Sequence, residues 1–247
     1  MNKFNEKMIK FYNFLLDIIY PPDIKCIFCG DDIENFKDKP YCKNCEKELN
    51  LNNSNTCEKC AGELLGEEKI CDFCQHKKRH FKKLVTPLKY DNIVRNTIIK
   101  FKDKKAKYLA RGFSVLMNKS LIENKIEFDY IIPVPISKKS LFKRKYNQSK
   151  LLAIQLGKIT NKEVLDILDY SKDIKKQKTL NYKERLENMK DAFVVKKEYI
   201  KIIKNKNILI VDDIITTCST VDNCAKALKK YPKNIYICGI SRNSIKK

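Results

Sequence analysis

The sequence predicts an α/β fold, in which a parallel sheet is flanked by helices and a small cysteine-rich region comes before it. Two observations support this fold class. Segments of strand and helix character alternate from residue 81 onward in the 247-residue chain, as they do in βαβ units. One of the strand segments, 208–211, is a run of four apolar residues, which is typical of a strand buried on both faces of a sheet.

The spacing of apolar residues locates the other elements. Helices are expected over 93–101, 106–121 and 151–159, and after Thr220, and strands over 81–90, 130–135, 164–168, 192–195 and 235–240. Pro133 and Pro135 end one of these strands with a stiff turn. Because ligands of parallel sheets bind beyond the carboxyl ends of the strands, we expect this turn and the segment after residue 211 to face one crevice.

The chain divides into three expected regions, 1–22, 23–80 and 81–247. The first is an amphipathic helix, which Pro21 and Pro22 end. Its polar face is not markedly basic, so packing on the protein or on a partner is favoured over a membrane surface. The sequence shows neither a signal-peptide core nor an apolar run long enough to span a bilayer, and we expect a cytoplasmic protein.

Residues 23–80 contain four Cys-x-x-Cys pairs, separated by 12, 11 and 10 residues: Cys26/Cys29, Cys42/Cys45, Cys57/Cys60 and Cys71/Cys74. Two such pairs supply four thiolates, so the region predicts a double zinc ribbon with two structural zinc ions. The simplest assignment is sequential, and an interleaved one stays open. Disulfides and iron are the alternatives, and a cytoplasmic setting disfavours disulfides. The basic cluster Lys77–His80 either contacts phosphate or is a solvated linker.

Polar side chains that are suited to binding a ligand follow strand 208–211 directly. Asp212 and Asp213 come first, and a loop rich in hydroxyl groups then leads into the next helix: Thr216, Thr217, Cys218, Ser219 and Thr220. Hydroxyls and backbone N–H groups at a helix N-terminus suit a phosphate, and carboxylates suit sugar hydroxyls. The alternative interpretation is a buried strand followed by an ordinary helix N-cap.

This segment resembles the phosphoribosyl pyrophosphate (PRPP) motif of type I phosphoribosyltransferases. The resemblance implies a type I phosphoribosyltransferase-like domain over 81–247, with Asp212 and Asp213 on the ribose. It also implies that residues 216–220 surround the 5'-phosphate and that Mg²⁺ bridges ribose and pyrophosphate. The family usually has glycine where this chain has Cys218, and glycine tolerates positive φ. The cysteine is either a neutral substitution or the basis of a redox-sensitive loop, its pKa lowered by the helix N-terminus.

More widely, the chain resembles the ComF family of competence proteins, which join a zinc finger or double ribbon to a phosphoribosyltransferase-like domain. The matching segments are the helix before Pro21, the four Cys pairs, Phe101-Lys102, residues 132–136 and 144–148, residues 177–180 with Arg185 and Asn188, the Asp212 motif, and Ser241-Arg242. The family's usual Arg-Gly-Phe-Asn-Gln has Lys145 for glycine and Tyr146 for phenylalanine here. The resemblance implies a role in natural transformation, where imported single-stranded DNA is handled at the cytoplasmic side beside a competence helicase.

Two functions follow from these patterns. In the first, the chain is an enzyme that transfers ribose phosphate from PRPP, and Asp212, Asp213 and Arg144 are its catalytic residues. Arg144 and Mg²⁺ then neutralise the charge of the pyrophosphate. The sequence shows no acceptor pocket for such a reaction. Alternatively, it is a non-catalytic adaptor that binds single-stranded DNA, which the charge of residues 81–247 favours: 39 Lys or Arg against 16 Asp or Glu, a net of +23. Lys makes up 46 of the 52 basic residues of the chain, as AT-rich coding also produces, so charge is supporting evidence only.

Overall fold

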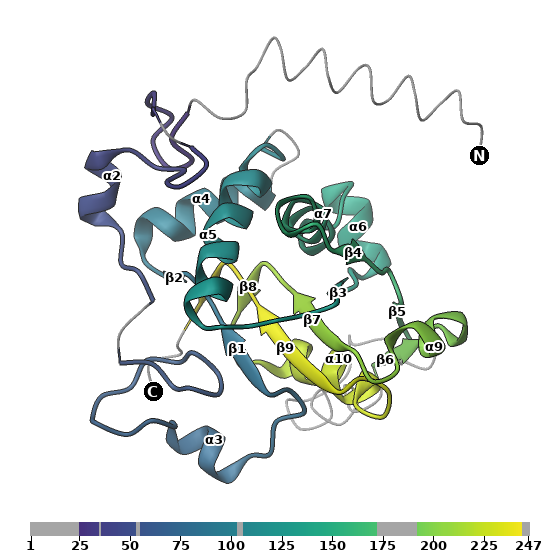
Figure 1. Ribbon diagram of the computed structural model, residues 1–247. Helices are drawn as coiled ribbons and strands as arrows, with labels where there is room; N and C mark the ends of the chain where they lie inside the picture. Colours follow the sequence, from purple (N-terminus) through teal and green to yellow (C-terminus); the bar gives the residue numbers. More distant parts are fainter. Residues whose placement is uncertain (1–24, 35, 53–54, 103–105, 172–191, 244–247) are drawn as a thin grey trace, which may run out of the picture.

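The computed structural model describes residues 25–34, 36–52, 55–102, 106–171 and 192–243. A five-stranded parallel sheet lies at its centre, in the order β1-β9-β7-β3-β4 (Figure 1). The strands are β1 (Lys83–Val85), β9 (Asn234–Cys238), β7 (Asn207–Val211), β3 (Tyr130–Pro133) and β4 (Glu163–Val164). The fold class predicted from the sequence is confirmed, and β7 with its four buried apolar residues is the middle strand.

Alternate residues of β7 face two different layers. Leu209 and Val211 belong to a core with three helices, α4 (Asn92–Lys102), α5 (Leu109–Glu123) and α7 (Gln148–Thr160). Ile208 and Ile210 belong to the core of the other face. That face holds α10 (Ser219–Leu228), the short α9 (Ile200–Ile203) after a 3-10 turn (Lys197–Tyr199), and the antiparallel pair β5 (Leu168–Tyr170) and β6 (Phe193–Val195).

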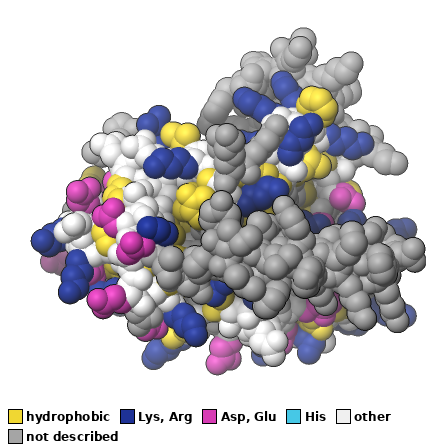
Figure 2. Space-filling view, turned by 90° about the horizontal axis from the view of Figure 1, so that it is seen from above, with side chains coloured by type: hydrophobic (Ala, Val, Ile, Leu, Met, Phe, Trp, Pro, Cys, Tyr) yellow, Lys and Arg dark blue, Asp and Glu magenta, His cyan; other side chains and the backbone are white. Residues whose placement is uncertain are grey.

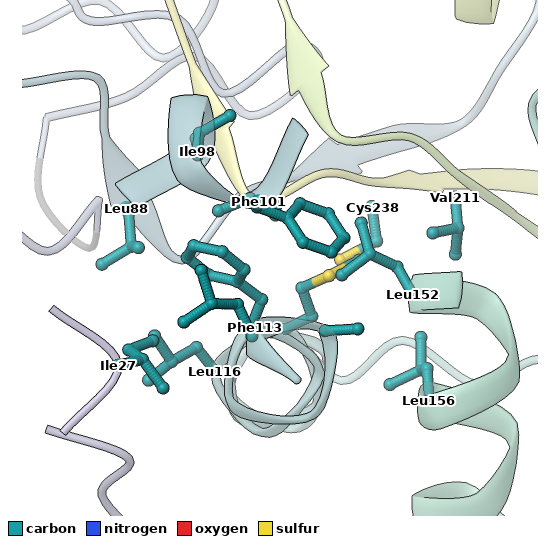
Figure 3. Close-up of a cluster of buried hydrophobic side chains, with 14 of the residues drawn as sticks. Ile27, Leu88, Ile98, Phe101, Phe113, Leu116, Leu152, Leu156, Val211 and Cys238 are labelled. Carbon is teal, nitrogen blue, oxygen red and sulfur yellow. The ribbon is translucent and has the colours of Figure 1, made fainter. Parts of the chain in front are cut away.

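The first of these cores is closed by the cysteine-rich region. Figure 3 shows Phe101, Phe113 and Leu152 packed together below the strands, with Ile27 from the cysteine-rich region at the edge of the cluster. The rings of Phe101 and Phe113 meet edge to face with centroids 5.7 Å apart. Gly112 of α5 allows the close approach of Ile27, since a Cβ at this glycine would lie 2.3 Å from Ile27 Cγ2.

A small parallel sheet, β2-β10-β8, continues the structure beyond the carboxyl ends of the central strands. Its strands are β2 (Leu88–Lys89), β10 (Ser241–Arg242) and β8 (Ile214–Ile215). The pairing of Arg242 with Ile215 places Arg242 beside the loop that follows β8. At the outer edge of the central sheet, the Leu84 N–H of β1 donates to the Lys59 carbonyl of the cysteine-rich region at 3.0 Å.

Some predicted strands are arranged differently from the expectation. Segment 192–195 forms β6 as predicted, but β6 pairs antiparallel with β5 outside the parallel sheet. Segment 81–90 divides into β1 and β2, because Pro87 interrupts it and has no N–H to donate. An unpredicted helix, α6 (Lys138–Arg144), begins after Ser137, whose Oγ accepts from the Ser140 N–H at 3.2 Å.

Several predictions fall outside the described residues, namely the helix over 1–22 and the segment 177–180 with Arg185 and Asn188. Within the described part of the chain, no helix combines the length and the apolar character that crossing a membrane requires.

Candidate functional site

The eight cysteines of the four pairs form two separate clusters, and in each the four sulfur atoms lie within 4.8 Å of one another. We call Cys26, Cys29, Cys42 and Cys45 the first site, and Cys57, Cys60, Cys71 and Cys74 the second site. The grouping is therefore the sequential one. The two sites are built alike, because a short helix follows the third cysteine of each: α2 (Lys43–Glu48) and α3 (Asp72–His76).

Backbone N–H donors lower the pKa of one cysteine in each site, whereas burial raises the pKa of others, such as Cys29 and Cys71. Burial raises the pKa of Cys26, but the N–H groups of Cys29, Cys42 and Phe28 outweigh it and lower this pKa to about 7. In the second site, burial is likewise outweighed at Cys57, whose pKa is also lowered to about 7. Thiolates are the form that binds zinc, and four of them leave no open coordination position. Both sites therefore fit a structural zinc ion.

The acidic pair lies at the carboxyl end of β7. Asp212 Oδ1 accepts hydrogen bonds from Ser149 Oγ at 2.8 Å and from the Asp213 N–H at 2.9 Å. Asp213 Oδ2 lies 3.2 Å from Lys102 Nζ. Burial first, and then the charge of Asp213, raise the pKa of Asp212 to about 7. Near neutral pH the charge of Asp212 and Asp213 therefore depends on the neighbouring charges and hydrogen-bond donors.

The turn after Pro133 lies next to this pair, as the sequence predicted. Pro133 pairs with Val211 in the parallel register, and the Val134 N–H donates to the Val211 carbonyl at 2.9 Å. Helix α7 begins here, and its second residue, Ser149, holds Asp212. Arg144 Nη1 donates to Oε1 of Gln148, the residue before Ser149, at 3.3 Å. Arg144 therefore does not contact the acidic pair directly. Its hydrogen bond goes to the side-chain amide of Gln148, the neighbour of the serine that binds Asp212.

The loop between β8 and α10 carries the predicted hydroxyl groups. Thr216 and Thr217 are exposed, and Thr217 Oγ1 lies 2.8 Å from Ser219 Oγ. Cys218 is the N-cap of α10 and makes no side-chain capping hydrogen bond. The Ser219 N–H donates instead to Thr217 Oγ1 at 3.3 Å. Ser219 and Thr220 at the start of α10 line a small hollow together with Asp212.

Two positions at which the resembled families have glycine adopt the left-handed backbone conformation that glycine favours. Cys218 has φ 63° and Lys145 has φ 65°. A side chain in this region costs about 1–2 kcal/mol per residue, so the chain keeps the glycine-type backbone at both positions in spite of the strain.

The side chain of Cys218 is turned toward the second site. It is 3% exposed, and Arg242 Nη1 donates to its sulfur at 2.6 Å. A hydrogen bond from Cys60, together with the positive charges of Arg242 and Arg79, lowers the pKa of Cys218 to about 7. The direction agrees with the prediction, but the causes are these neighbours and not the helix N-terminus.

Sequence reasoning gave no role to Lys102 or Ser149, and it placed Arg79 in a basic cluster that either contacts phosphate or is a solvated linker. Arg79 is 7% exposed, and its Nη2 donates to the Thr217 carbonyl at 3.3 Å. Hydrophobic spacing located α4 and α7, which carry Lys102 and Ser149. No local pattern, however, marks a residue whose partner lies far away in the sequence, as Asp212 and Asp213 do here. The match of Phe101-Lys102 to the family pattern was the one signal that pointed to Lys102.

Comparison with known proteins agrees with these features. Residues 15–75 match the family model of the double zinc ribbon domain. Competence protein F of Haemophilus influenzae is 27% identical over 250 residues, which span 95% of this chain and 100% of that protein. The similarity thus covers both the cysteine-rich region and the parallel sheet. This chain is a homologue of competence protein F and carries an N-terminal double zinc ribbon domain.

Proposed function

We propose that this protein binds PRPP or a related sugar phosphate, together with Mg²⁺, at the carboxyl end of β7. The observation that supports this most is the order of parts along one segment. Two carboxylates end the middle strand, a hydroxyl-rich loop with a left-handed residue follows, and the N-cap side chain of α10, that of Cys218, leaves the helix N–H groups without a capping bond of its own. Each part suits a different group of a phosphorylated sugar.

The contacts of the site suggest how the ligand is held. Asp212 and Asp213 bind the ribose hydroxyls, residues 216–220 bind the 5'-phosphate, and Arg144 contacts the pyrophosphate. Ser149 and Lys102 are positioning residues, since they already fix one carboxylate each. Mg²⁺ supplies neutralising charge to the pyrophosphate. With an acceptor present, the same placement suits cleavage of the bond between ribose and pyrophosphate, because Arg144 stabilises the departing negative charge.

The similarity to competence protein F extends the proposal to natural transformation. That relative covers 95% of this chain, including the segment around Asp212. We therefore propose that the sugar-phosphate site belongs to a protein that acts in the handling of imported DNA.

Calorimetric titration of the zinc-loaded protein with PRPP and Mg²⁺ tests the binding site. We expect saturable binding that needs Mg²⁺ and that falls at least tenfold in the double variant Asp212→Asn/Asp213→Asn. The matched control is Asp31→Asn/Asp32→Asn, which removes an adjacent pair of exposed carboxylates in the first zinc ribbon. Equal affinity in both double variants, or no binding by protein that still holds zinc, would overturn the proposal.

A second candidate function, binding of single-stranded DNA, is favoured by the surface of α6. This helix carries Lys138, Lys139 and Lys143, and its Phe142 is 76% exposed. Lys145 Nζ lies 4.3 Å from the centre of the Phe142 ring. An exposed ring among lysines is a platform on which a base can stack while the lysines contact phosphates. Figure 2 shows Lys and Arg side chains spread over one face of the molecule, among hydrophobic and acidic ones.

Fluorescence anisotropy with a single-stranded oligonucleotide tests this candidate over a series of salt concentrations. We expect affinity to fall steeply with salt, and Phe142→Ala to weaken binding by roughly 5- to 150-fold, the loss that one stacked base of ~1–3 kcal/mol implies. Ile122→Ala is the control, because Ile122 is an exposed apolar residue of α5. Unchanged binding by Phe142→Ala would exclude α6 as the contact surface.

A further inference from the structure

We propose that the second zinc site positions the phosphate loop, residues 216–220, through Arg79 and Arg242, so that sugar-phosphate affinity depends on zinc at the second site and not at the first. The inference rests on the proposed function for its effect on affinity. Its structural part, the attachment of the loop to the second site, stands on contacts of its own.

The first contact joins Cys218 of the loop to Cys60 of the second site. Both side chains are almost fully buried in the same core. Arg242 donates to the Cys218 sulfur, and it also packs on Gly62, where a Cβ would lie 3.2 Å from Arg242 Nε. One guanidinium therefore lies between the loop and the backbone of the second zinc ribbon.

The second contact runs through Arg79, five residues after Cys74. Its guanidinium donates to the carbonyl of Thr217 and lies beside the sulfur of Cys74. The same group lies 4.7 Å from the centre of the Phe73 ring and 6.0 Å from that of Phe81. These rings hold Arg79 in a single place between the site and the loop.

A third contact ties the start of α10 to the same segment. The His80 N–H donates to Asp222 Oδ1 at 2.8 Å, and His80 Nδ1 lies 3.2 Å from Asp222 Oδ2. Asp222 lies in the first turn of α10 and is 7% exposed. Loop and helix N-terminus are therefore both fastened to the residues that follow the second site.

Charge explains why zinc matters to these contacts. Four thiolates around one Zn²⁺ leave an excess of two negative charges, and Arg79 and Arg242 supply two positive charges beside them. A buried guanidinium without such compensation is costly. Protein that lacks this ion has nothing to hold the four cysteines in one place, so Arg79 and Arg242 lose the fixed segments that keep them against Thr217 and Cys218. The left-handed conformation of Cys218 then has fewer contacts that enforce it.

The first site provides the contrast. Its buried residues pack on α5 in the core of the opposite sheet face, and among the described residues none of its contacts reaches the phosphate loop. Zinc at the first site is expected to stabilise the fold without changing the loop.

The test compares Cys71→Ser with Cys42→Ser. Both cysteines are the third ligand of their site, both precede a short helix, and both are half-buried. We expect each variant to lose one zinc ion per chain. In Cys71→Ser, alkylation of Cys218, followed by peptide mass spectrometry, rises at least tenfold, and PRPP affinity falls at least tenfold. In Cys42→Ser, both quantities stay within twofold of the unchanged protein.

Equal protection of Cys218 in both variants would overturn the inference, whatever the affinity for PRPP. If the unchanged protein does not bind PRPP, the proposed function fails, and the alkylation result still decides whether the loop is held by the second site. Where a variant of a zinc-binding cysteine does not fold, Arg242→Ala is tested in its place, since this variant keeps all eight cysteines of the two sites. We expect Arg242→Ala to keep both zinc ions, to expose Cys218 at least fivefold, and to be partly rescued by Arg242→Lys. Unchanged Cys218 protection in Arg242→Ala would equally overturn the inference.

Discussion

The two zinc ribbons use the same ligands and the same local geometry, yet they lie on opposite faces of the central sheet. In both, the residue before the first cysteine bridges the residue seven positions later, Lys25 with Asp32 and Thr56 with Glu63. The first ribbon buries Ile27 and its neighbours against α5, and the second buries Cys57 and Cys60 beside the phosphate loop. The two ribbons therefore differ in the surface against which they pack and not in their metal chemistry. The first stabilises the fold, and the second positions the phosphate loop.

Removal of both zinc ions tests what the two ribbons share. Zinc contributes about 10 kcal/mol or more to the folding of small zinc domains, so we expect the melting temperature to fall by more than about 10 °C. Residues 25–80 should become the first target of trypsin. Calorimetry and limited proteolysis measure both effects. An unchanged melting temperature would mean that neither ribbon depends on metal.

Gly112→Ala breaks the docking of the first ribbon alone. The new Cβ would lie 2.3 Å from Ile27 Cγ2, and overpacking of this kind costs about 1–3 kcal/mol of unfolding free energy. Urea denaturation measures the loss, while PRPP affinity should stay within twofold. Gly66→Ala is the control, because its Cβ would meet only the end of the Glu68 side chain. A large loss of PRPP affinity in Gly112→Ala would contradict the separation of tasks.

The pH dependence of PRPP binding sharpens the comparison, because the titrating residue, Asp212, belongs to the ligand site and to neither ribbon. The pKa of Asp212 is raised from 3.8 to about 7, so its protonated form favours the folded state below pH 3.8 and this contribution disappears as pH rises through 7. Ligand with Mg²⁺ requires the ionised form. We expect the affinity for PRPP to fall up to tenfold for each pH unit below pH 7. Asp212 should take up a proton when the ligand leaves. Calorimetry in buffers of different ionisation enthalpy measures this, and zinc content should stay constant down to pH 6. Affinity that is flat between pH 6 and 8 would refute the assignment to Asp212.

Cys218→Gly is expected to have the smallest effect on stability. Glycine relieves the left-handed strain of about 1 kcal/mol, and loss of the buried sulfur removes a contribution of similar size. The free energy of unfolding should change by less than about 1 kcal/mol, whereas PRPP affinity should fall about threefold because the contact with Arg242 is lost. Cys218→Ala, which keeps the strain and removes the sulfur, is the control. Tighter PRPP binding by Cys218→Gly would show that the sulfur contact does not help the loop.

Local patterns predicted the features that depend on neighbouring residues. Four successive apolar residues gave the middle strand, and the Cys-x-x-Cys spacing gave both metal sites, because each depends on a few positions in sequence. Contacts between distant segments were beyond these patterns. Arg79 meets Thr217 across 138 positions and Ser149 meets Asp212 across 63, and neither pair has a periodic signal. For the same reason the pairing of β6 with β5 was missed, since strand character does not specify a partner.

The hydrogen bond between Leu84 and Lys59 has a consequence for protein that lacks metal. Strand β1 is the outermost strand of the central sheet, and the second ribbon covers part of its outer edge through this bond. Unpaired backbone groups at a sheet edge recruit strands from other molecules. Loss of zinc at the second site therefore exposes an edge at which copies of the chain can join. We therefore expect protein made without metal to aggregate.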